Sequence, residues 1–124
     1  ARGDLLPLTS QVQLFEAARL ILWHDIIEPA LDANALVICD RLWLSNWVYQ
    51  DTKVKALPYI DLLFYLQDNS NPVLHNKYLD AISLAISEHH INEAVLIDAT
   101  DIAKAADNII TQICERKSGL RRYT

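Results

Sequence analysis

Hydrophobic residues near the N-terminus recur at the spacing of an α-helix. One stripe of this helix consists of Val12, Phe15, Arg19, Leu22 and Ile26. Thr9 or Ser10 could cap its first turn, since hydroxyl side chains accept bonds from the free N–H groups there. The pattern predicts a helix that reaches about Glu28, where Pro29 ends or kinks it. Because apolar residues also occupy the opposite side, we expect this helix to be central in the fold.

Three short apolar runs follow, at residues 36–39, 61–66 and 94–97. Such runs are typical of strands that are buried on both faces of a parallel sheet. A turn is predicted at residues 68–72. The helix after it has an apolar stripe of Leu74, Tyr78, Leu79, Ile82 and Ile86. The helix after the last run has a stripe of Ile102, Ala105, Ala106, Ile109, Ile110 and Ile113. Alternating helices and apolar strands predict an α/β fold, a parallel sheet flanked by helices.

Composition limits the classes of protein that fit this pattern. The 124 residues, of which 52% are hydrophobic, predict a single domain at residues 1–115, with a basic tail at 116–124. The net charge of −5 argues against nucleic acid as a partner. Cys39 and Cys114 form no CxxC pair, so a reducing, cytoplasmic setting is expected, without a disulfide framework or zinc site. No apolar run reaches the roughly 20 residues of a membrane span, and no membrane partner is expected.

Polar side chains follow the first predicted strand. In parallel α/β sheets, ligands bind beyond the carboxyl ends of the strands. Asp40 and Arg41 stand there, and Ser45, Asn46 and Tyr49 follow at near-helical spacing. A guanidinium can hold a phosphate through two hydrogen bonds, and a carboxylate can orient it or hold a metal-bound water. The Asn46 amide offers both a donor and an acceptor for the edge of a base.

Phe15 and Arg19 are four residues apart on the first predicted helix and therefore share a face. Together they would supply a flat surface for stacking a base and a donor for its carbonyl. A stacked base contributes roughly 1–3 kcal/mol.

In order and spacing, four segments resemble the thymidylate kinase family. They are LFEAAR at residues 14–19, IEPAL at 27–31, VICDR at 37–41 and SNWVYQ at 45–50. Residues 77–79 and 97–100, with the closing helix, resemble the C-terminal part of that family. Residues 51–76 fit it poorly, apart from the predicted strand. The resemblance implies a P-loop kinase-like fold and the ATP-dependent phosphorylation of dTMP to dTDP, with Mg²⁺ bridging the donor phosphates. It also implies a possible homodimer.

The resemblance also implies roles for individual side chains that would contact the nucleoside. Phe15 would stack on the thymine ring, and Arg19 would donate to a thymine carbonyl. Asn46 would read the edge of the base, and Ser45 would lie in the same pocket. Tyr49 would press on the sugar and disfavour a 2′-hydroxyl.

Further roles concern the phosphates. Arg41 would hold the acceptor phosphate, with Asp40 beside the magnesium ion and the centre of phosphoryl transfer. The loop of Asp98, Ala99 and Thr100 would lie near the adenine of ATP. No residue is assigned as a direct metal ligand.

The sequence also departs from the family pattern. It contains no GxxxxGK(S/T) motif, and Gly3 and Gly119 are its only glycines. The first strand and phosphate loop of the family would precede Arg2. In that family's sheet, this strand lies between the strands represented by residues 36–39 and 61–66. We therefore expect a fold without the N-terminal strand and phosphate loop. The chain would receive that strand from elsewhere, rearrange, or represent only the ordered parts of a longer protein, and we favour the last of these.

Simpler interpretations exist for each residue on its own. Asp40 and Arg41 could form a surface ion pair, Phe15 could belong to the core, and Tyr49 could pack with nearby tryptophans. Only the joint occurrence of the polar and aromatic residues favours a nucleotide site. The alternative to a kinase is a non-catalytic relative that acts as a binding or assembly subunit. The choice between dTMP, dUMP and dCMP also stays open at this point.

Overall fold

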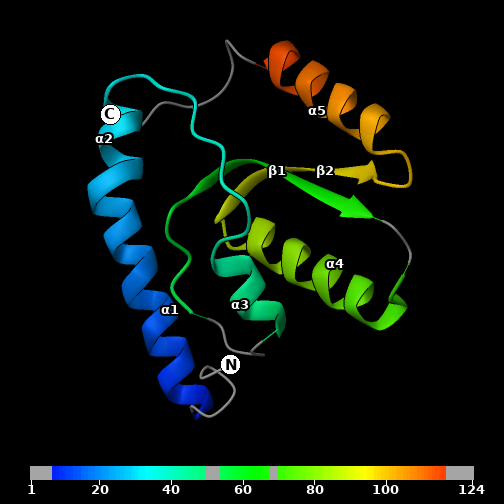
Figure 1. The fold of residues 1–124 in the computed structure, drawn as a ribbon. Helices are drawn as coiled ribbons and strands as arrows, with labels where there is room; N and C mark the ends of the chain where they lie inside the picture. The colour runs from blue at the N-terminus through cyan, green and yellow to red at the C-terminus, as the bar shows by residue number, and fades with distance from the viewer. Residues whose placement is uncertain (1–6, 50–53, 68–69, 117–124) are drawn as a thin grey trace. The chain divides into compact units, whose positions relative to one another are not determined.

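The computed structural model describes residues 7–49, 54–67 and 70–116 (Figure 1). Its internal contacts divide the chain into two compact units, the first ending at Pro58 and the second beginning at Tyr59. Residues 68 and 69 of the predicted turn and residues 117–124 of the predicted tail lie outside the described residues. The prediction of a single domain stays a prediction. Within the described residues, no helix is both long and apolar enough to cross a membrane.

The first unit begins with a helix in three parts. The α-helix α1 (Leu8–Leu22) continues into the π-helix η2 (Trp23–Ile27) and then into the α-helix α2 (Glu28–Asp32). Pro29 was predicted to end or kink the helix; it does not end it, because the helical backbone continues through α2 with this proline in its first turn. The predicted hydroxyl cap was also wrong: Pro7 is the N-cap, without a side-chain hydrogen bond.

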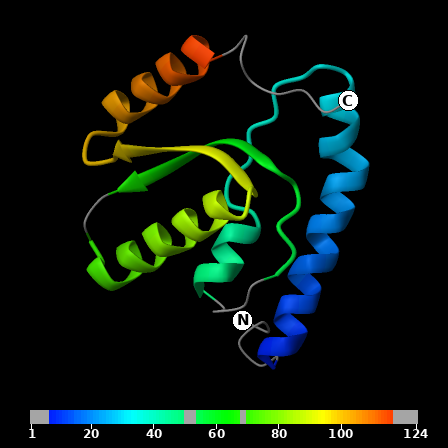
Figure 2. The same ribbon diagram turned by 180° about the vertical axis from the view of Figure 1, so that it is seen from behind.

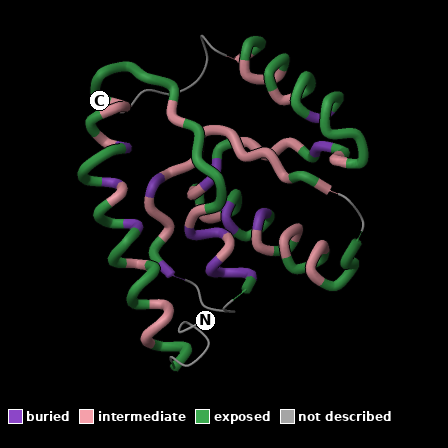
Figure 3. Tube along the Cα trace, in the orientation of Figure 1, coloured by how far each residue is buried: buried purple, intermediate pink, exposed green. Residues whose placement is uncertain are grey.

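The side chains of α1 are mostly exposed, so the expectation of a central helix was wrong. Phe15 is 55% exposed, and its neighbour Leu14 is 59% exposed. The buried residues of α1 and η2 are Arg19, Trp23 and Ile27, four residues apart along one side of the helix (Figure 3). The helix thus buries one narrow stripe, and a charged arginine is part of that stripe.

Residues 36–39 do not form the first predicted strand. They belong to an irregular segment in which Leu36 and Ile38 are 58% and 76% exposed, and Cys39 is exposed as well. An apolar run becomes a strand only when its backbone groups pair with a neighbouring strand. Within the described residues, the sheet contains only the two strands of the second unit. The segment leads into the short helix α3 (Trp43–Tyr49).

The second unit confirms the α/β prediction of a parallel sheet flanked by helices. It contains β1 (Ile60–Gln67), α4 (Pro72–Ser87), β2 (Ile91–Asp98) and α5 (Ile102–Arg116). The strands pair in parallel, from Ile60 opposite Ile91 to Gln67 opposite Asp98. Two of the three predicted strands and both later helices are confirmed. Arg116, predicted to begin the tail, is the last residue of α5.

The two helices of this unit cover opposite sides of the strand pair (Figures 1 and 2). On one side, the Tyr65 ring stacks on His75 and Tyr78 of α4, with ring centroids 5.5 and 5.4 Å away. On the other side, Glu93 of β2 binds Arg116 of α5. Because side chains alternate along a strand, Tyr65 and Glu93 face opposite sides in this register.

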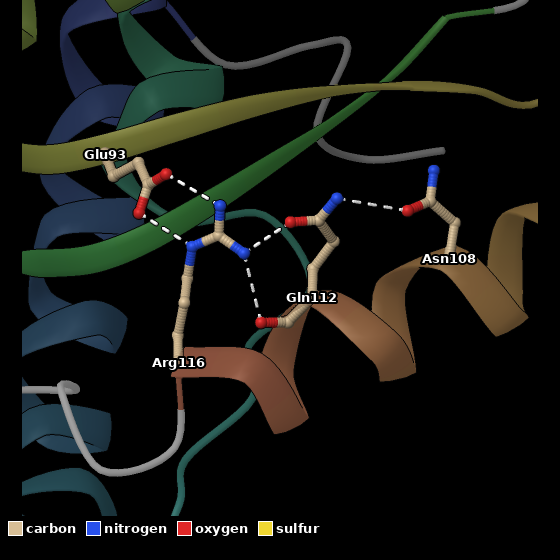
Figure 4. Close-up of polar contacts among 4 residues, drawn as sticks. All are labelled: Glu93, Asn108, Gln112 and Arg116. Carbon is tan, nitrogen blue, oxygen red and sulfur yellow. Dashed lines mark hydrogen bonds and ion pairs between the residues drawn. The ribbon is translucent and has the colours of Figure 1, made fainter.

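Arg116 links α5 to β2 through a fork of hydrogen bonds (Figure 4). Its Nε and Nη2 atoms donate to the two carboxylate oxygens of Glu93, each at 2.9 Å. Its Nη1 atom donates to the backbone carbonyl and the side-chain oxygen of Gln112, whose amide in turn donates to Asn108. The hydrogen bond from Arg116 lowers the pKa of Glu93 below its ordinary value of 4.5. The ionised form of Glu93 therefore stabilises the folded state.

We predict that Glu93→Gln lowers the midpoint of thermal unfolding at neutral pH. A carboxyl whose pKa is lowered by folding contributes stability above its unfolded pKa and loses it as the pH falls through the folded value. The difference between the variant and the wild type should therefore shrink as the pH falls below 4.5. Asp107→Asn, at an exposed carboxylate of α5, is the control and should show no such change. A Glu93→Gln difference that is the same on both sides of this pH would contradict the prediction.

Candidate functional site

In the first unit, α3 is bound to the segment at residues 54–58 through two indole rings. The Nε1 atom of Trp43 donates to the carbonyl of Pro58 at 2.9 Å. The Nε1 atom of Trp47 donates to the carbonyl of Val54 at 2.8 Å. Both tryptophans are buried, and their ring centroids are 4.8 Å apart with a tilt of 51°. A buried indole N–H requires an acceptor, so these bonds fix both the helix and the segment.

The helix α1 contacts the same two elements through polar side chains. Arg19 Nη1 donates to Asn46 Oδ1 of α3 at 2.7 Å. The Glu16 carboxylate accepts a long hydrogen bond, 3.4 Å, from the backbone N–H of Lys55. These hydrogen bonds join α1, α3 and the segment at residues 54–58, which are distant in sequence, within the first unit.

Arg19 is the most unusual group in this arrangement. Arg19 and Asn46 are both buried, with only 8% and 9% of their surface exposed. The second terminal nitrogen of Arg19, Nη2, is buried and has no hydrogen-bond partner among the residues that the structure describes. Burial lowers the pKa of the Arg19 guanidinium, although the nearby Glu16 carboxylate acts in the opposite direction. An unsatisfied buried donor is costly, and an acceptor oxygen placed beside Nη2 would remove that cost.

Arg41 and Tyr49 form a second pair in the same unit. The guanidinium carbon of Arg41 lies 5.7 Å from the centroid of the Tyr49 ring, and both residues are exposed. Arg41 has a φ of 58°, a left-handed conformation that costs about 1–2 kcal/mol in a residue other than glycine. Strained backbone of this kind is concentrated at functional sites. The guanidinium is thus held over an aromatic face while its charge stays accessible.

The structure brings together some, but not all, of the predicted site residues. Arg19 contacts Asn46, and Arg41 contacts Tyr49. Asp40 is exposed in the turn before α3, Ser45 is half-buried on α3, and the Phe15 ring is exposed on α1. Their roles remain predictions.

The predicted adenine loop lies in the second unit, after the carboxyl end of β2. The Asp98 carboxylate accepts hydrogen bonds from the backbone N–H and the hydroxyl of Thr100, at 2.9 and 2.8 Å. These bonds lower the pKa of Asp98. The N–H of Ala99 donates to the carbonyl of Gln67 on β1 at 2.8 Å. The loop is a well-bonded turn, and its role near a nucleotide stays a prediction.

The described residues do not fit a bound ATP and magnesium ion without further groups. In the ranges 7–49, 54–67 and 70–116, no three His, Cys, Asp or Glu side chains gather where they could hold a metal. The phosphate-loop motif does not occur in the 124 residues.

Trp43 and Trp47 were missed as parts of the site, since an aromatic residue on a helix is by default a core residue. Glu16 was not singled out either. Two tryptophans spaced four apart around Asn46 were the signal, because each buried indole N–H has to find an acceptor.

Comparisons with known proteins find similarity in sequence to two curated thymidylate kinases. The α/β unit, with its parallel strand pair between two helices, fits part of a P-loop kinase-like fold. The chain is 41% identical over 56 residues to the thymidylate kinase of Nitrobacter winogradskyi, covering 45% of this chain and 24% of that protein. It is 35% identical over 81 residues to the thymidylate kinase of Buchnera aphidicola subsp. Baizongia pistaciae, covering 64% of this chain and 38% of that protein.

These matches support the thymidylate kinase-like relationship expected from the sequence. The chain spans between about a quarter and two fifths of the length of these curated relatives. No family model matches the chain, and no solved structure gives a significant match.

We predict that Asn46→Ala destabilises the protein by about 1.5–3 kcal/mol, the typical contribution of a hydrogen bond to a charged group. The variant would remove the acceptor of Arg19 Nη1, so that neither terminal nitrogen of this buried side chain would have an acceptor among the described residues. Asn108→Ala is the matched control, since that exposed amide accepts a bond from Gln112 on the surface of α5. It should change the free energy of unfolding by less than about 0.5 kcal/mol. Urea denaturation measures both, and equal losses would contradict the interpretation of the Arg19–Asn46 bond.

Proposed function

We propose that this chain forms the acceptor-binding part of a thymidylate kinase-like phosphotransferase, which converts dTMP to dTDP with ATP as the phosphoryl donor. The similarity to two thymidylate kinases supports this class of activity. The polar groups of the first unit support a nucleotide as the ligand. Within that class, the chain's own residues would bind and orient the acceptor.

The observation that carries the proposal is the buried Nη2 atom of Arg19, which lacks a partner in the described part of the chain. Arg19 carries only donors, so the missing partner must be an acceptor. A pyrimidine with a carbonyl at position 4 supplies such an oxygen. A cytosine presents an amino group at that position and would leave the donor unsatisfied. The site therefore favours dTMP or dUMP over dCMP, because a missing hydrogen bond to a buried polar group is strongly discriminating.

The exposed groups around α3 suit the rest of the nucleotide. Arg41 carries a permanent positive charge and a planar fork of donors, which matches a phosphate. The exposed Phe15 ring on α1 offers a stacking surface for the base. Asp40, Ser45 and Tyr49 retain the roles expected from the resemblance: the transfer centre, the base pocket and the sugar.

Catalysis in this class of reaction depends mainly on positioning and on neutralising charge. Here Arg41 would hold the acceptor phosphate, and the Arg19–Asn46 pair would fix the base at the other end of the nucleotide. ATP would supply the phosphoryl group, and Mg²⁺ would supply positive charge that offsets the negative charge of the phosphates. The cradle for the donor phosphates requires residues other than those in this sequence, although Asp98, Ala99 and Thr100 are proposed to lie near the adenine.

A non-catalytic binding or assembly subunit is the second candidate. The 124 residues contain no GxxxxGK(S/T) motif, so a catalytic protein of this class would need that motif from residues other than these. Incubation of the full-length protein that carries this chain with ATP, Mg²⁺ and dTMP distinguishes the candidates. Formation of dTDP supports the kinase, whereas dTMP binding without dTDP formation supports the binding subunit.

For binding itself, we predict that Phe15→Ala weakens the affinity for dTMP by roughly 1–3 kcal/mol through lost stacking. Leu14→Ala is the matched control, because Leu14 is an equally exposed apolar neighbour on α1. Its affinity should match that of the wild type. Isothermal titration calorimetry provides the measurement. Unchanged affinity in Phe15→Ala, beside a wild type that binds dTMP, would remove Phe15 from the site.

A further inference from the structure

The helix α3 is too short to hold its own position. It has seven residues, from Trp43 to Tyr49. Isolated helices shorter than about 12–15 residues are marginal in water, so tertiary contacts must fix α3. The segment before it, residues 35–42, is neither helix nor strand, and its apolar residues Leu36 and Ile38 are exposed. The anchors of α3 must therefore come from its own buried side chains.

The two indole rings are anchors of this kind. Trp43 is fully buried, Trp47 is 8% exposed, and they share a face of α3 because they are four residues apart. Their N–H groups bind the carbonyls of Pro58 and Val54 at 2.9 and 2.8 Å. Asn46 lies between them in the sequence. The position of the Asn46 amide therefore depends on both bonds.

From this geometry we propose that Trp43 and Trp47 are positioning residues that set the base specificity of the acceptor site by holding Asn46 against Arg19. The proposal rests on the function proposed above. Neither ring needs to touch the nucleotide. Each acts through α3, which carries the only acceptor that the structure gives to Arg19 among the described residues.

A small displacement of α3 is enough to change the site. The Arg19–Asn46 bond is short, at 2.7 Å, and hydrogen bonds weaken steeply with misalignment. Without it the guanidinium is free to rotate, and Nη2 no longer points in one direction. The preference for a carbonyl over an amino group at position 4 of the base depends on that direction. Loss of an indole anchor should therefore reduce specificity as well as affinity.

The test uses Trp47→Phe and Trp43→Phe, which keep an aromatic ring but remove the N–H donor. Affinities for dTMP and dCMP are measured by calorimetry. In each variant we expect dTMP to bind about 3- to 10-fold more weakly, the equivalent of one ordinary hydrogen bond, while dCMP is little changed. The preference for dTMP over dCMP should fall by the same factor. Ile82→Val in α4, a buried residue of the second unit, controls for a general loss of stability and should leave the preference unchanged.

The proposal is overturned if the wild type prefers dTMP and the tryptophan variants keep the full preference. Trp43 and Trp47 would then be core residues with no role in specificity. A wild type that binds neither nucleotide would instead overturn the proposed function. The anchoring is then tested without ligand, through the NMR resonances of the Asn46 side-chain amide. Trp47→Phe should shift these resonances and Ile82→Val should not. Unchanged resonances in Trp47→Phe would contradict the claim that the Trp47 indole fixes the position of Asn46.

Discussion

A guanidinium removed from water must recover its hydrogen bonds within the protein, and Arg19 recovers them only in part. Its Nη1 atom binds Asn46 at 2.7 Å, while Nη2 has no partner within residues 7–49, 54–67 and 70–116. Removing a charged group from water is expensive unless it is paired and hydrogen-bonded. The first unit accepts this cost at Arg19, one of its few buried polar residues. An incompletely satisfied buried donor is expected where a ligand completes the set.

The contacts around the Arg19 guanidinium help to hold it in place. Glu16 lies one turn before Arg19 on α1 and raises its pKa against the effect of burial. The two indoles hold α3, and α3 presents Asn46. The second unit is built differently, from a regular ladder of parallel strands with α5 fastened by the Glu93–Arg116 fork. Backbone pairing holds one unit, and individual side-chain hydrogen bonds are prominent in the other.

This difference explains how far the sequence predicts the fold and the site. The strands at residues 61–66 and 94–97 were predictable because each has a partner within the chain, so the apolar pattern and the ladder agree. Residues 36–39 have the same pattern but lack a neighbouring strand among the described residues. The pattern of side chains does not show whether such a strand is present. Helical periodicity placed Phe15 and Arg19 on one face, yet one is exposed and the other buried. The Arg19–Asn46 contact joins residues 27 apart, and only the resemblance to thymidylate kinases linked them.

The central claim is that the orphan nitrogen of Arg19 receives a carbonyl oxygen of a pyrimidine monophosphate. A crystal structure of the protein with dTMP tests it most directly. The account predicts a thymine carbonyl oxygen at about 2.7–3.2 Å from Arg19 Nη2, the ordinary range for such a bond. Bound dTMP that lies away from Arg19, with Nη2 satisfied by a buried water or a protein group, would contradict it.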